Sequence, residues 1–265
     1  DIDGVLARGG VALPAASVVR EKLVGRNGRD WRVPTVFLTN GGGVTEEAKA
    51  AELSSMLGVE VSPDQVALSH TPFRHALAPR LRNRPVLVAG RGDVGAVARA
   101  DGFAAVVTTR ELALADPRAL PFRRPADFLP GGGDRGAVGE GFGSAAGDRG
   151  GGAGAGAERF SAVPPPRHWG TALAPFAAAL VFSDPHDWYA DLQLLVDVVE
   201  TKGAPLPLPA DAGAGADAAA AAASAFEGIF FSNPDLEFAG THPRPRFGQG
   251  SFACCFAALH RSILE

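Results

Sequence analysis

The sequence predicts an α/β protein built on a parallel β-sheet. Short apolar segments alternate with helical patterns along the chain, which is the order typical of β-α-β units. Most of these apolar segments carry hydrophobic residues at successive positions, as strands do when helices cover both faces of a sheet. A chain of 265 residues is long enough to bury a core without the help of disulfides.

Six segments read as strands, and they are residues 35–39, 65–69, 85–90, 104–108, 178–183 and 228–232. A helix is predicted between the first two. Thr45 can cap its N-terminus, two glutamates occupy the first turn where the helix dipole favours them, and Gly58 can end it. The face of this helix that we expect to be buried consists of Ala50, Leu53, Met56 and Leu57.

Composition argues against several classes of protein. The net charge of −4 gives no electrostatic reason to expect a nucleic acid or an anionic membrane as partner. The longest apolar stretch, TALAPFAAALVF, is too short to cross a bilayer, so no membrane span is expected. Cys254 and Cys255 are adjacent and are interpreted as small apolar residues of a helix, so no disulfide framework is indicated. The oligomeric state is not indicated.

Two segments do not have the composition of folded protein. Residues 131–156 are rich in glycine and poor in large apolar side chains, so they cannot bury enough surface to offset the entropy of ordering them. We expect a disordered insertion there. Residues 205–225 begin with prolines and continue as an alanine run that can be partly helical. Neither insertion is expected to carry the function.

The first candidate site is the opening Asp1-Ile-Asp3-Gly4. In extended backbone Asp1 and Asp3 project to the same side, and Gly4 lets the chain turn. Two carboxylates can divide the work of phosphoryl transfer, because one can attack phosphorus while the other protonates the leaving alcohol and then activates water. A divalent cation such as Mg²⁺ is then needed to neutralise the repulsion between carboxylate and phosphate. The alternative is a solvated turn.

The second candidate site is the segment VPTVFLTNGGG, a strand that ends in Thr39 and Asn40 before three glycines. Open α/β sheets bind ligands at the carboxyl ends of their strands, so a hydroxyl and an amide at this position are well placed to contact a ligand. The Thr39 hydroxyl can donate a hydrogen bond to a phosphoryl oxygen.

With these two motifs the chain resembles the haloacid dehalogenase superfamily of phosphotransferases. The segments DQVALSHTPF, VLVAGRGD, GFAAVVTTREL, ALVFSDPHDWYADLQLL and IFFSNPDLEF, with PRFGQGSF further on, are similar to its class IIA branch, specifically the cat eye syndrome critical region protein 5 subfamily. The resemblance implies a Mg²⁺-dependent phosphatase that hydrolyses a small phosphorylated substrate through an aspartyl phosphate.

The resemblance also implies the role of each site residue. Asp1 matches the nucleophile, which is also a metal ligand, and Asp3 matches the general acid and base, whose backbone carbonyl is another metal ligand. Thr39 and Asn40 match the motif that binds substrate and phosphate. The implied domains are a core over residues 1–75, a C2-type α/β cap over 76–239 that closes over the site, and a return to the core over 240–265. Relatives in this subfamily suggest a mitochondrial location, otherwise a cytoplasmic one, and a link to glycerophospholipid metabolism.

The lysine and the acidic pair that complete the family's site are not found in this sequence. Lys202 lies within the implied cap and is interpreted as a loop residue. We therefore expect an internal fragment, inactive by itself, of a longer phosphatase. A non-catalytic binding or scaffold protein remains an alternative.

A competing pattern lies in residues 85–100. Gly90, Gly92 and Gly95 follow a predicted strand with the spacing of a dinucleotide-binding loop, and Glu111 lies where a ribose-binding acid can be expected. A dinucleotide-binding oxidoreductase is the less favoured alternative.

Other candidates have weaker signals. Asp184, His186 and Asp187 have side chains that can bind metals, but they cluster in one loop, and substrate contact is the preferred interpretation. His70 ends a predicted strand and has no assigned role. Arg246 and Gln249 are expected to be structural.

Overall fold

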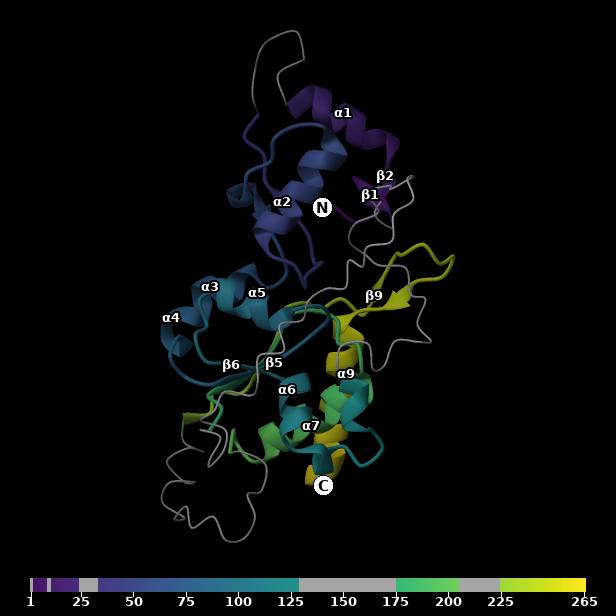
Figure 1. Cartoon of the computed structure of the whole chain (residues 1–265). Coiled ribbons are helices and arrows are strands. Elements are labelled where there is room, and N and C mark those ends of the chain that lie inside the picture. The colour runs from purple at the N-terminus through teal and green to yellow at the C-terminus, as the bar shows by residue number, and fades with distance from the viewer. Residues whose placement is uncertain (1, 9–10, 24–32, 129–174, 205–224) are drawn as a thin grey trace.

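A computed structural model describes residues 2–8, 11–23, 33–128, 175–204 and 225–265 (Figure 1). Asp1, residues 131–156 and nearly all of 205–225 lie outside these ranges, so the predictions made for them are not addressed. Among the described residues, no helix is long and apolar enough to span a membrane.

The largest sheet has four parallel strands in the order β6-β5-β7-β8. They are β5 (Val86–Ala89), β6 (Val106–Thr108), β7 (Ala178–Val181) and β8 (Ile229–Phe231). Each lies within a predicted strand and is shorter than predicted. Every residue of β5 and β7, the two central strands, is buried, as expected for strands with helices on both faces.

Helices cover this sheet on both sides (Figure 1). Alternate strand residues, Val86 and Val88 among them, pack against α3 (Thr71–Ala76), α4 (Ala78–Leu81) and α5 (Val94–Ala100). The residues between them, including Leu87 and Ala89, pack against α6 (Thr109–Ala115), α7 (Trp188–Glu200) and α9 (Gln249–Leu264). The result is a three-layer α/β structure, which confirms the predicted fold class.

The N-terminal elements form a separate apolar cluster. Its parallel pair is β3 (Phe37–Leu38) with β4 (Val66–Ala67), and both strands were predicted. Beside them lie the antiparallel hairpin of β1 (Ala7–Arg8) and β2 (Val11–Ala12), and the helices α1 (Pro14–Leu23), η1 (Pro63–Gln65) and α2 (Glu46–Leu57).

Helix α2 confirms the helix predicted between residues 45 and 58. The Thr45 side chain accepts a hydrogen bond from the Ala48 N–H, and Gly58 ends the helix in the left-handed conformation with φ 64°. Three of the four residues expected on its buried face are buried, and Met56 is partly exposed.

The C-terminal part adds a second hairpin and a long helix. Strands β9 (Glu237–Phe238) and β10 (Arg246–Phe247) pair antiparallel. The Arg8 Nε donates to the carbonyl of Gly240 in this hairpin at 3.4 Å. The remaining short helices, η2 (Pro117–Ala119) and η3 (Pro125–Phe128), follow α6.

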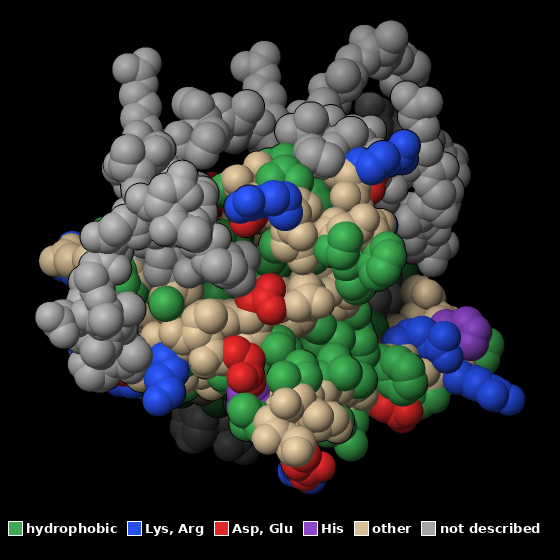
Figure 2. Space-filling model, turned by 90° about the horizontal axis from the view of Figure 1, so that it is seen from below, with side chains coloured by type: hydrophobic (Ala, Val, Ile, Leu, Met, Phe, Trp, Pro, Cys, Tyr) green, Lys and Arg blue, Asp and Glu red, His purple; other side chains and the backbone are tan. Residues whose placement is uncertain are grey.

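Helix α9 is amphipathic, and its two cysteines differ from expectation. Phe252 and Phe256 are buried against the sheet layer. Cys254 and Cys255 lie on the helix as predicted, but both are exposed free thiols rather than packed apolar residues. Cys254 is two residues from both Phe252 and Phe256, so it lies on the opposite side of the helix from them. Seen from the side of the C-terminus, the surface has hydrophobic side chains gathered among polar ones (Figure 2).

The division into core and cap stays a prediction, but the structure places its proposed limits. The limit between residues 75 and 76 falls inside α3, whose Phe73 packs with the four-stranded sheet. Helix α9, expected to return to the core, packs with α7 on the other face of that sheet.

One carboxyl group is buried between α6 and α7, two helices on the same face of the four-stranded sheet. Asp191 of α7 is 6% exposed, and its Oδ1 accepts a hydrogen bond from the Thr109 hydroxyl at the start of α6. Burial raises the pKa of Asp191 to about 7. Because the unfolded carboxyl ionises at a lower pH, the stability linked to this group is full in acid and is lost as pH rises through about 7.

We predict that Asp191→Asn removes the fall in stability that accompanies ionisation of Asp191 as pH rises. Between about pH 4 and pH 8, the unfolding free energy of the variant should rise relative to that of the wild type by on the order of 2–4 kcal/mol. Urea unfolding of both proteins at several pH values measures the difference. A difference that stays constant over this range would show that Asp191 ionises normally in the folded protein.

Candidate active site

The loop after β3 packs onto the carboxyl end of the four-stranded sheet. A Cβ atom on Gly42 would lie 2.7 Å from the carbonyl oxygen of Phe182, the residue that follows β7. It would also lie 2.7 Å from the Ser69 hydroxyl. A side chain does not fit at this distance, so glycine allows the two backbones to meet here.

Asp3 and Thr39 lie together at this junction. The Thr39 hydroxyl donates to Oδ2 of Asp3 at 3.0 Å, and the Gly41 N–H donates to the Thr39 oxygen at 3.0 Å. Thr39 is buried, whereas Asp3 is exposed. The two predicted site residues therefore meet, although they are 36 residues apart in the sequence.

This chain of hydrogen bonds orients the Asp3 carboxylate. The hydroxyl of Thr39 has a single proton, and it points to Asp3. Thr39 is thus a positioning residue for Asp3 in this arrangement, and direct contact of Thr39 with phosphate stays a prediction. Asp1 lies outside the described residues.

Asn40 connects this loop to the segment after β8. Its Nδ2 donates to Oδ2 of Asp235 at 2.7 Å, and the Asn233 amide donates to the Asn40 carbonyl at 3.1 Å. The Asp235 N–H in turn donates to Oδ1 of Asn233. Asn233 and Asp235 were not predicted as site residues, although polar residues that follow a parallel strand often lie at a ligand-binding edge.

A buried polar group lies beneath this contact. Gln249 is fully buried, and its Oε1 accepts the Asn233 N–H at 2.8 Å. The Ser232 hydroxyl approaches both Ser69 and the Phe182 carbonyl. Gln249 therefore has the structural role expected of it, and it helps to hold the ends of β4, β7 and β8 together.

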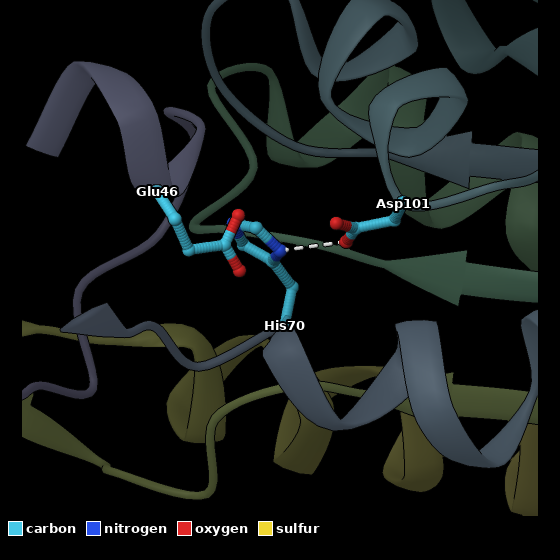
Figure 3. A group of neighbouring side chains, drawn as sticks. All are labelled: Glu46, His70 and Asp101. Atoms are coloured by element: carbon cyan, nitrogen blue, oxygen red, sulfur yellow. Dashed lines mark hydrogen bonds and ion pairs between the residues drawn. The ribbon is translucent and has the colours of Figure 1, made fainter. Parts of the chain in front are cut away.

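A second cluster combines Glu46, His70, Arg74 and Asp101, of which Figure 3 shows Glu46, His70 and Asp101. Arg74 donates to Oε2 of Glu46 at 2.6 Å and to Oδ1 of Asp101 at 2.7 Å. His70 is fully buried, with Nδ1 2.8 Å from Oδ2 of Asp101 and Nε2 3.0 Å from the Val44 carbonyl. Since both ring nitrogens face acceptors, only the imidazolium form can donate to both.

Three residues of this cluster, Glu46, His70 and Asp101, bring possible metal ligands within 4.8 Å of one another. Their ligand atoms already have partners in the protein. Thr71 donates to the remaining Glu46 oxygen at 2.7 Å. A guanidinium between the two carboxylates neutralises the charge that would attract a cation. The cluster is an internal ion-pair network and does not fit Mg²⁺.

The glycine loop after β5 does not have the form of a dinucleotide site. A Cβ on Gly90, which has φ 150°, would lie 2.6 Å from the Ser183 hydroxyl, and that hydroxyl accepts the Arg91 N–H. Asp93 caps the start of α5, where a pyrophosphate would bind. Glu111, the expected ribose ligand, instead forms a capping box with Thr108.

The loop after β7 also has local structural roles. Asp187 caps α7 and pairs with Arg123, and His186 is exposed. Among the described residues, Asp184, His186 and Asp187 do not form a group of three metal ligands. Lys202 lies in the turn after α7 with φ 50°, in keeping with its expected role as a loop residue.

We predict that the protein does not bind NAD or FAD, because Ser183 and Asp93 occupy the positions where a pyrophosphate would be held. Isothermal titration calorimetry with each cofactor measures this. Micromolar affinity, about −8 kcal/mol, would contradict the interpretation of the glycine loop as structural.

Comparison with known proteins gives matches to hydrolases. A sequence model of the haloacid dehalogenase-like hydrolases matches residues 1–104. A mitochondrial hydrolase of Saccharomyces cerevisiae is 31% identical over 99% of this chain, which spans 61% of that protein. A fusion of cardiolipin synthase (CMP-forming) with a mitochondrial hydrolase, from Schizosaccharomyces pombe, is 29% identical over 99% of the chain and 36% of its own length. The chain thus spans less than two thirds of either relative.

Solved structures agree on the fold. The chain is similar to a 4-nitrophenylphosphatase of Thermotoga maritima, with a TM-score of 0.51, 13% identity, and coverage of 97% of this chain and 62% of the other. It is also similar to a hypothetical protein of Pyrococcus horikoshii, with a TM-score of 0.50, 18% identity, and coverage of 98% of this chain and 66% of the other. Residues 1–104, which include Asp3 and Thr39, therefore match the haloacid dehalogenase-like hydrolases in sequence, and the chain as a whole is similar to a mitochondrial hydrolase in sequence and to a 4-nitrophenylphosphatase in fold.

Proposed function

We propose that the protein is a Mg²⁺-dependent phosphatase that hydrolyses a small phosphorylated metabolite through an aspartyl phosphate. The observation that supports this most is the hydrogen bond between Thr39 and Asp3, because it joins the two motifs at the carboxyl end of a parallel strand. A carboxylate that is exposed and yet oriented is suited to proton transfer to a bound ligand.

In this mechanism Asp1 attacks phosphorus, and the bond between phosphorus and the leaving oxygen breaks. Asp3 gives its proton to the leaving alcohol. It then takes a proton from the water that attacks the aspartyl phosphate, which releases inorganic phosphate and restores Asp1. Thr39 holds Asp3 in one orientation through both steps, since its own oxygen is fixed by the Gly41 N–H.

The residues at this position fit Mg²⁺ better than the buried cluster does. Asp1 would offer a carboxylate oxygen and Asp3 its backbone carbonyl oxygen, and Mg²⁺ prefers oxygen ligands and keeps several waters. Asp1 and Asp3 would hold the ion, which when bound neutralises charge on the transferring phosphoryl group.

We further propose that residues 76–239 act as the cap. The four-stranded sheet lies within this range, and its carboxyl end contacts the loop of Thr39 and Asn40 through Phe182 and Asp235. A cap in this position would exclude water from the site.

The names of the relatives support two further parts of the proposal. Both curated relatives are described as mitochondrial hydrolases, so we propose a mitochondrial location. One structural neighbour is named a 4-nitrophenylphosphatase, which makes p-nitrophenyl phosphate a suitable probe for this protein. Membership of the cat eye syndrome critical region protein 5 subfamily and a link to glycerophospholipid metabolism stay predictions.

We predict that, in the full-length protein, Asp1→Asn nearly abolishes hydrolysis of p-nitrophenyl phosphate in the presence of Mg²⁺, because an amide does not attack phosphorus. Asp3→Asn should lower kcat by about 10²–10⁴-fold, since it removes the proton donor and the base. EDTA should remove the activity of the wild type.

Asp64→Asn serves as the control, because Asp64 is an exposed acidic residue in η1. Its activity should equal that of the wild type. Wild-type rates in both Asp1→Asn and Asp3→Asn would show that these carboxylates are not the catalytic pair. A protein that hydrolyses no phosphate ester with Mg²⁺ would instead favour the non-catalytic alternative.

A further inference from the structure

His70, which the sequence left without a role, lies directly beneath the loop of residues 39–44, called here the Thr39 loop. The residue is fully buried, and its Cδ2 atom would lie 3.5 Å from a Cβ atom on Gly42. The ring also packs against Phe182, with 5.4 Å between the ring centroids, and the Phe182 carbonyl approaches the same glycine. The Thr39 loop therefore lies on these two residues.

The Thr39 loop needs support from outside, because residues 41–43 are successive glycines. Without side chains their backbone has high conformational freedom, so the position of the loop must be set by its neighbours. The Ser69 N–H donates to the Gly41 carbonyl at 3.2 Å, and Nε2 of His70 lies 3.0 Å from the Val44 carbonyl. Two successive residues after β4 therefore hold the loop on both sides of its central glycine.

The hydrogen bonds of the His70 ring require a proton on each nitrogen. Nδ1 lies 2.8 Å from Oδ2 of Asp101, a contact drawn in Figure 3, and Nε2 faces the Val44 carbonyl, which can only accept. The other oxygen of Asp101 accepts from Nε and Nη2 of Arg74, which favours the carboxylate over the protonated acid. A neutral ring would therefore leave one nitrogen against an oxygen with no proton between them.

The charges around the ring lead to the same conclusion. Glu46 and Asp101 are buried carboxylates, and Arg74 supplies one positive charge to both of them. With a neutral His70 this cluster has one negative charge in excess, and an uncompensated buried charge is costly. A positive His70 brings the sum to zero. Glu47 also interacts with Arg74 and Asp101, but it is exposed, so water screens its charge.

We propose that His70 is held as an imidazolium and is a positioning residue for the proposed phosphatase. Its Nε2–H fixes the Val44 carbonyl, and this keeps the Thr39 loop where the Thr39 hydroxyl orients Asp3. The effect on catalysis rests on the proposed function, whereas the charge of the ring can be measured without it. Asp101, which lies within the range proposed as the cap, orients the ring from the other side.

The charge of His70 is tested by nuclear magnetic resonance of the full-length protein with nitrogen-labelled histidine at neutral pH. An imidazolium has protons on both ring nitrogens, and those of a buried, hydrogen-bonded ring exchange slowly with water. We expect two ring N–H signals that disappear in His70→Gln while the signals of the other histidines stay. His75→Asn, which removes an exposed histidine of α3, should keep both signals. A single ring N–H signal for His70 would overturn the imidazolium.

The positioning role is tested by two uncharged variants that keep different hydrogen bonds. Counted in bonds from Cβ, the amide nitrogen of glutamine corresponds to Nε2 of histidine and that of asparagine to Nδ1. His70→Gln can thus still donate to the Val44 carbonyl, whereas His70→Asn can donate only to Asp101. Values of kcat and KM for p-nitrophenyl phosphate with Mg²⁺ are measured on the full-length proteins and expressed per folded molecule. His75→Asn is again the control.

We expect His70→Asn to lower kcat about 10–100-fold and to leave KM within about threefold. The reason is that a displaced Asp3 slows proton transfer without removing a contact to the substrate. His70→Gln should recover most of the lost kcat, because it restores the donor to Val44. The control should behave as the wild type.

Other outcomes overturn the inference in distinct ways. Wild-type kcat in His70→Asn shows that His70 only stabilises the fold. An equal loss of kcat in both His70 variants shows that the bond to Val44 does not position the loop. If the wild type hydrolyses no phosphate ester, the positioning role fails together with the proposed phosphatase function, and the ring N–H signals still decide whether His70 is an imidazolium.

Discussion

The buried ion pairs of Arg74 with Glu46 and Asp101 are the interaction on which the arrangement of this protein depends. Glu46 begins α2, Arg74 belongs to α3, and Asp101 ends α5, so one guanidinium joins the N-terminal elements to the layer of helices over the four-stranded sheet. Removing one partner of a buried ion pair typically costs about 3–5 kcal/mol. Because Arg74 is itself partly exposed, solvent screening lowers this cost here.

The same network reaches the candidate active site through His70. Its imidazole contacts both Asp101 and the Val44 carbonyl, and Val44 directly follows the glycines of the loop that carries Thr39 and Asn40. The loop is then held from three sides, by this contact at its end, by the Thr39 bond to Asp3 at its start, and by the backbone of Phe182 beneath Gly42. A site that must place a carboxylate within hydrogen-bonding distance of a leaving group requires such rigid support.

Local sequence patterns predicted the regular elements well, and long-range contacts poorly. All six predicted strands exist, and α2 has the predicted cap and end, because apolar runs and capping residues act within a few neighbours. Asp3 and Thr39 were each predicted as site residues from their own motifs, and the structure joins them by a hydrogen bond. The partner of Asn40 is 195 residues away, and no local pattern connects it to Asp235. The hairpin β1–β2 has two-residue strands, which are too short to show a period.

The central claim, that phosphoryl transfer passes through Asp1 with Asp3 as acid and base, can be tested by trapping the intermediate. In the full-length protein, Asp3→Asn lacks the base that activates water, so it should accumulate the aspartyl phosphate after mixing with p-nitrophenyl phosphate and Mg²⁺. Mass spectrometry of acid-quenched, digested protein should then find one added phosphoryl group on the peptide that contains Asp1, and none on that peptide in Asp1→Asn. A phosphoryl group on any other residue, or turnover by the wild type with no phosphorylated Asp1 in either protein, would contradict the account.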